Sequence, residues 1–60
     1  MNKTAFNFYV NKAFRKAKRL ARQNHQDYAV VNVHGFIGVM RQSYIDETEQ
    51  QNLVIKRVWE

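Results

Sequence analysis

The chain has 60 residues with no cysteine and no proline, and its ten Lys and Arg against five Asp and Glu give a formal net charge of +5. A chain this short forms at most one domain, which buries about 60% of its unfolded surface. The lack of cysteine excludes disulfides and thiolate metal sites. We therefore expect one small domain over residues 1–60, stabilised by aromatic packing or by self-association.

Neither residues 1–12 nor the apolar segments of the sequence indicate secretion or membrane insertion. Residues 1–12 lack the pattern of a secretory signal, because Asn7 interrupts the apolar run and no small-residue cleavage site follows. No segment approaches the roughly 20 apolar residues of a membrane span. We expect a cytoplasmic protein with no membrane partner.

The charge is unevenly distributed along the chain. Residues 1–26 contain seven Lys and Arg and no acid, whereas residues 27–60 contain three basic and five acidic residues. Segregation of this kind points to a polyanionic or acidic partner, although it says nothing about the fold.

The first predicted element is an amphipathic helix over residues 4–24, with Asn2 or Thr4 as its N-cap. Ala, Lys, Arg and Leu in this segment are good helix formers, and no glycine or proline interrupts it. Apolar side chains recur at the spacing i, i+4, i+7, i+11, i+14, which places them on one side of a helix. These residues are Phe6, Val10, Ala13, Ala17 and Leu20.

After residue 27 the sequence becomes rich in β-branched and aromatic residues, which favour strands. We predict two antiparallel strands over residues 28–34 and 36–45, reversing at His34 and Gly35. A polar, acidic connection over 46–52 then leads to a third strand over 53–59. A helix within 46–58 is the competing interpretation.

These elements predict an α+β fold in which one long N-terminal amphipathic helix packs on a three-stranded antiparallel β-meander, in the order α-β-β-β. The strands carry apolar residues on both faces, and one helix can cover only one of them. The second face, or an unpaired strand edge, is therefore a candidate homodimer or partner interface. Its candidate residues are Val30, Ile37, Val39, Val54 and Val58.

A second row of residues lies about 200° around the helix from the apolar row, at the same spacing. It consists of one aromatic residue followed by four cations, and two lysines flank it. We predict that this surface binds nucleic acid, with the cations on phosphates and the aromatic ring on an unpaired base. The candidate binding residues are Phe8, Lys12, Arg15, Lys16, Lys18, Arg19 and Arg22.

Other interpretations of the same surface remain open. It could be an ordinary solvated helix face with Phe8 packed against a neighbouring segment. Such faces usually mix signs and gain i, i+4 ion pairs, however, whereas this helix places like charges at that spacing. The helix could instead dock on an acidic protein surface, or an open strand could extend a partner's sheet. Binding to a membrane surface is a third alternative.

Catalysis has little support in the sequence. No catalytic motif, phosphate-binding loop, cofactor site or small-molecule substrate site is evident, and Ser43 is the only serine. His25 and His34 are too few for a metal site without cysteine. A metal-free ribonuclease remains the one enzymatic alternative, with either histidine as acid or base and Arg41 or Arg57 stabilising the phosphate.

Overall fold

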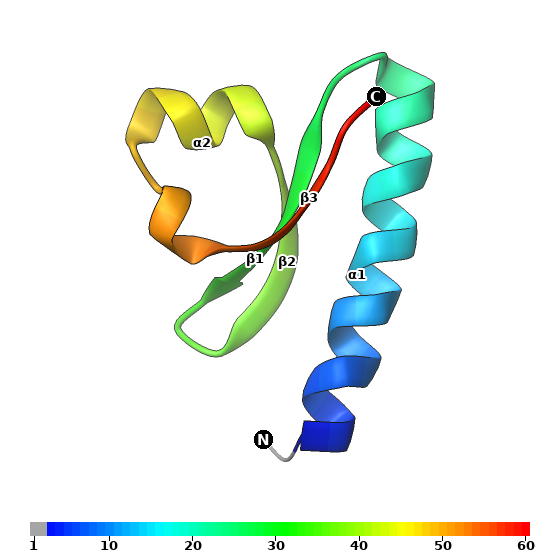
Figure 1. Ribbon diagram of the computed structural model, residues 1–60, viewed down its shortest axis with the longest axis vertical. Helices are drawn as coiled ribbons and strands as arrows, with labels where there is room; N and C mark the ends of the chain where they lie inside the picture. Colours follow the sequence, from blue (N-terminus) through cyan, green and yellow to red (C-terminus); the bar gives the residue numbers. More distant parts are fainter. Residues whose placement is uncertain (1–2) are drawn as a thin grey trace.

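A computed structural model of the chain describes residues 3–60. A long helix covers one face of a three-stranded antiparallel sheet, and a short helix covers the opposite face (Figure 1). The α+β class predicted from the sequence is thus confirmed. The elements are α1 (Lys3–Asn24), β1 (Tyr28–Val33), β2 (Phe36–Arg41), α2 (Gln42–Thr48), the 3₁₀ helix η1 (Gln51–Leu53) and β3 (Val54–Val58).

Helix α1 forms as predicted and begins one residue earlier, at Lys3. The side chains that seat it most deeply on the sheet are small, because Ala17 and Ala21 are its buried residues. The helix ends at Asn24, and His25 follows in the left-handed conformation that commonly terminates helices. Thr4 lies inside the helix, and the other proposed cap, Asn2, lies outside the described residues.

Strands β1 and β2 form the predicted hairpin, with His34 and Gly35 as its loop. Both loop residues have positive φ, 52° and 90°, as a type I′ turn requires. The Oδ1 atom of Asn32 accepts a hydrogen bond of 2.8 Å from the N–H of Gly35 and holds the loop. The register pairs Val33 with Phe36 and continues to the far end of the hairpin.

The second strand ends at Arg41 and does not continue to residue 45 as the sequence predicts. Strand β1 begins at Tyr28, whose partner is Arg41, so a longer β2 would lack a neighbour to bond. The chain instead forms α2, which places Ile45 in a fully buried position. The segment 46–52, predicted as a connection, contains the last residues of α2. The competing prediction of a helix within 46–58 is wrong for residues 54–58, which form β3.

The predicted meander is wrong in its strand order. In a meander β3 would pair with β2, whereas the observed order is β2-β1-β3 and β3 pairs with β1. Both outer strands are antiparallel to β1 and are therefore parallel to each other. Parallel strands need a crossover connection of about a dozen residues, usually with a helix. Residues 42–53, which include α2 and η1, form this crossover and pass over the sheet face opposite α1.

The crossover divides the interior into two apolar clusters. The cluster under α1 is built on Ala17, Ala21, Tyr28, Val30 and Val58, and the cluster under α2 is built on Ala29, Val31 and Ile45. A register shift between Val30 and Val31 gives β3 an extra residue at this point. Because a one-residue shift moves side chains to the other face, Val58 joins the first cluster and Val54 the second.

Candidate nucleic-acid interface

The cationic side chains of α1 lie on the outer and lateral surfaces of the helix. The alanines and the larger apolar residues of the first row face the sheet, and a displacement of about 200° turns the second row into solvent. Phe8, at the start of this row, is 57% exposed. All six cations proposed to bind are exposed: Lys12, Arg15, Lys16, Lys18, Arg19 and Arg22.

The protein's own carboxylates do not neutralise these cations. Within residues 3–60 the only ion pair lies between His25 and Glu60, at 3.1 Å. Helix α1 contains no acid, and the acidic residues of the crossover lie on the far side of the sheet. The cationic surface of α1 therefore retains its charge in the folded protein.

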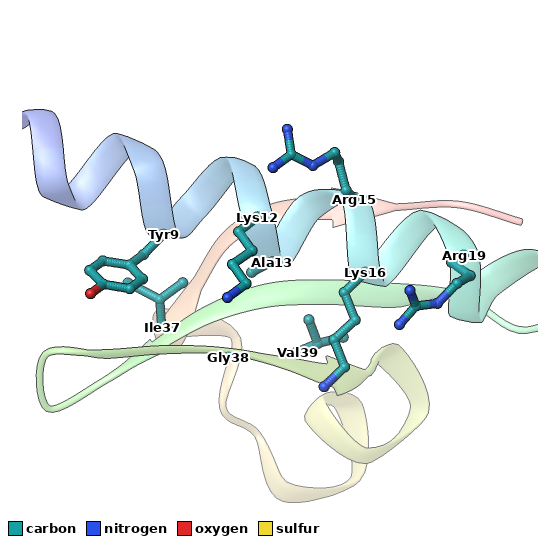
Figure 2. A pocket seen from close by; sticks show the side chains of 9 residues that line it. All are labelled: Tyr9, Lys12, Ala13, Arg15, Lys16, Arg19, Ile37, Gly38 and Val39. Atoms are coloured by element: carbon teal, nitrogen blue, oxygen red, sulfur yellow. The ribbon is translucent and has the colours of Figure 1, made fainter.

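A groove separates α1 from the edge strand β2. Its volume is about 600 Å³, and Ala13, Ile37 and Val39 supply apolar surface to it. Figure 2 shows the side chains of Lys12 and Lys16 extending from α1 toward β2.

The charged residues that line the groove are all cations, and no carboxylate of residues 3–60 lines it. Arg19 borders the same groove farther along α1, whereas the side chain of Arg15 points away from β2 (Figure 2). An anionic ligand in the groove would meet the cations on one side and apolar strand surface on the other.

A second, smaller depression of about 440 Å³ lies toward the C-terminal end of α1. Arg15, Lys18, Arg19 and Arg22 border it together with Gln23, so four of its five lining residues are cationic. The depression and the groove share Arg15 and Arg19, which makes the positive surface continuous along the helix.

The opposite flank of α1 carries a cation that sequence reasoning missed. The Nζ atoms of Lys18 and Lys56 lie 4.8 Å and 4.2 Å from the centroid of the Phe14 ring. Both are within the range of a cation–π interaction. Lys56 comes from β3 and extends the positive surface beyond the helix, which only the register of the sheet could have revealed.

Tyr9 lines the groove and is also absent from the predicted binding residues. The sequence places it only at the flank of the apolar row, but its ring is 48% exposed and borders the groove. The rings of Phe8 and Tyr9 meet edge to face, with centroids 5.4 Å apart and an interplanar angle of 79°. Two exposed rings thus stand beside the cations of α1.

The structure places the proposed interface valines and isoleucine inside the protein's own layers. Val30 and Val58 are buried under α1, and Ile37 and Val39 pack at the rim of the same cluster. Val54 packs against the cluster under α2. The prediction of a second copy named an uncovered sheet face or an unpaired strand edge. The crossover covers the face, whereas β2 and β3 remain the edge strands of the sheet.

The two histidines lie far apart. His25 precedes β1 and His34 follows it, so the six residues of this strand separate them by about 20 Å. His34 lies in the exposed hairpin loop, and Arg41 lies at the opposite end of β2. The structure therefore separates the two histidines from each other, and His34 from Arg41, by the length of a strand.

Comparison with protein-family models, curated proteins and solved structures found no match to this chain. Neither α1 nor α2, the α-helices described in residues 3–60, is apolar over a length that would cross a bilayer. The functional inference therefore depends on the chemistry of the surface itself.

Proposed function

We propose that this protein binds nucleic acid through the cationic surface of α1. The observation that carries the proposal is that six exposed cations follow one helix and have no carboxylate partner within residues 3–60. Cations in this state neutralise phosphates and release condensed counterions, which drives binding without sequence preference. The guanidinium groups add paired donors suited to phosphate oxygens.

The geometry of α1 supports a polymeric ligand over a small anion. From Lys12 to Arg22 the helix rises about 15 Å at 1.5 Å per residue, and its cations are distributed along this whole length. A single phosphate would contact only a few of them. A nucleic-acid backbone presents a row of negative charges that matches the extended row of cations.

Salt dependence tests this proposal. The double variant Arg15→Ala/Arg19→Ala removes two cations shared by the groove and the neighbouring depression. If both contact phosphates, the slope of log K against log salt concentration should decrease in magnitude by about 1.4 for single strands or 1.8 for duplex. Fluorescence anisotropy with a labelled oligonucleotide measures the slope.

The control is Arg57→Ala, which removes a cation from an exposed position on the sheet face that α2 covers, since its partner Ala29 belongs to the cluster under α2. We expect this control to leave the slope near that of the wild type. Binding that is independent of salt and of both α1 arginines would contradict the proposal.

An acidic protein segment is the second candidate ligand, and the open edge of β2 favours it because an extended chain can pair there. Polyglutamate distinguishes the two ligands when it competes with the oligonucleotide at equal charge concentration. Nucleic acid should bind more tightly, because its bases can stack on the exposed ring of Phe8, which polyglutamate cannot do. Tighter binding of polyglutamate would transfer the function to a protein partner. A cytoplasmic location is part of the proposal for either ligand.

A further inference from the structure

The groove between α1 and β2 combines three features that a purely electrostatic contact would not need. Its walls carry cations on the helix side and apolar side chains on the strand side, and an exposed aromatic ring borders it. A ligand that offers only charge would contact the lysines and would not need the apolar or aromatic side chains of the groove. The groove suits a ligand with anionic and flat apolar parts.

The aromatic part of the groove is held in a defined position. Tyr9 emerges from α1 near Ile37, and its ring lies beside that side chain in Figure 2. The ring of Tyr9 also meets the ring of Phe8 edge to face, an arrangement that aromatic pairs prefer. Lys12 lies one turn farther along the same helix. A base stacked on Tyr9 would therefore have a cation close to its phosphate.

The strand side of the groove also offers unpaired backbone groups. The N–H of Gln42 donates to the carbonyl of Asp27 over 2.9 Å, and bonding toward the neighbour alternates along an antiparallel strand. The even-numbered residues of β2 thus face β1, and Ile37 and Val39 direct their N–H and C=O groups to the free edge. The edges of an unpaired base carry complementary donors and acceptors.

We infer that this groove binds single-stranded nucleic acid, with an unpaired base against Tyr9 and the adjoining phosphates on Lys12 and Lys16. The inference rests on the proposed function and narrows it to one class of nucleic acid. In a duplex the bases are stacked inside and cannot reach the strand wall. A duplex would contact only the outer ridge of α1, where Arg15 and Arg22 lie, and would leave the groove unused.

Removal of bases without removal of phosphates tests the inference. The probes are a short oligothymidylate and an abasic oligomer of the same length and charge. Wild-type protein should bind the first more tightly. Tyr9→Ala should weaken oligothymidylate binding by about 5- to 150-fold, the effect of losing one stacked base, and should leave abasic binding unchanged.

Two further variants separate stacking from damage to the fold. Tyr9→Phe retains the aromatic ring and should bind both oligomers as the wild type does. Tyr44→Ala removes a tyrosine of the same 48% exposure from α2, on the far side of the sheet, and should also bind both normally. Circular dichroism and urea unfolding verify that each variant is folded.

The outcomes distinguish this inference from the proposed function. Equal wild-type affinity for the two oligomers, or equal losses in Tyr9→Ala, would overturn base stacking and leave phosphate binding intact. Tighter binding of a duplex of the same length would also overturn it. If neither oligomer nor the duplex binds, the proposed function fails as well.

Discussion

Helices α1 and α2 cover opposite faces of one sheet by different means. Helix α1 has 22 residues and approaches the sheet closely through two buried alanines, whereas α2 has seven residues and depends on the single large side chain of Ile45. The exposed surfaces also differ, because α1 has no acid and α2 contains Asp46 and Glu47. The sheet thus separates a basic layer from an acidic one, and the net charge understates the positive potential at α1.

The largest expected effect comes from removing the one large side chain that seats α2. Ile45→Ala should lower the free energy of unfolding by about 2–5 kcal/mol, because it deletes fully buried methyl groups and leaves a cavity. A domain this small has little stability to lose, so much of the population should unfold. Urea denaturation measures the change.

Tyr44→Ala serves as the control for this comparison, since it truncates a half-exposed neighbour on the same helix. If Ile45→Ala lowers the free energy of unfolding no more than Tyr44→Ala does, α2 does not depend on the packing of Ile45.

A smaller effect should follow from raising the net charge by one unit in either the basic layer or the acidic layer. Gln23→Lys places a cation in the depression on α1, and Glu47→Gln removes an anion from α2. Both raise the net charge by one unit. Charges separated by more than the Debye length of about 8 Å at physiological salt are largely screened.

We therefore expect Gln23→Lys to raise oligonucleotide affinity several-fold and Glu47→Gln to change it little, as measured by titration at physiological salt. Equal gains would mean that total charge governs binding and that the α1 surface has no special role.

The smallest predicted effect concerns a buried amide of α2. Gln42 is 8% exposed, and its Nε2 donates to Asp46 over 3.0 Å, but its Oε1 has no hydrogen-bond partner among residues 3–60. An unsatisfied buried acceptor costs stability, so Gln42→Leu should equal the wild type or exceed it by up to about 1 kcal/mol in urea. Gln51→Leu, at an exposed position, is the control. A clear loss in Gln42→Leu alone would contradict this account.

The long helix and the hairpin could be predicted because their signals are local. The apolar spacing from Phe6 to Leu20 specifies one helical face, and the His34–Gly35 pair separates two β-branched runs. Neither feature depends on a distant part of the chain. The cations on the outer surface of α1 follow from the same periodicity, so their exposure was also predictable.

The remainder of the fold depends on contacts that the sequence does not display. Tyr44 and Ile45 resemble the end of a strand, and a seven-residue helix with two buried positions is too short to show a period. The strand order follows from the crossover, and the bulge near Ile55 breaks the alternation of β3. The groove requires β2 to lie beside α1, so the roles of Ile37 and Val39 in the wall could not be assigned.

The repulsion between like charges on α1 has a consequence for attempts to raise the stability of this protein. Lys12 and Lys16, and Arg15 and Arg19, repel one another at i, i+4 spacing, which weakens a helix by a few tenths of a kcal/mol per pair. Introducing glutamates between them would be an obvious route to a higher melting temperature. Under the proposed function such designs would also lower the affinity for nucleic acid, so stability and the proposed binding would compete on this helix.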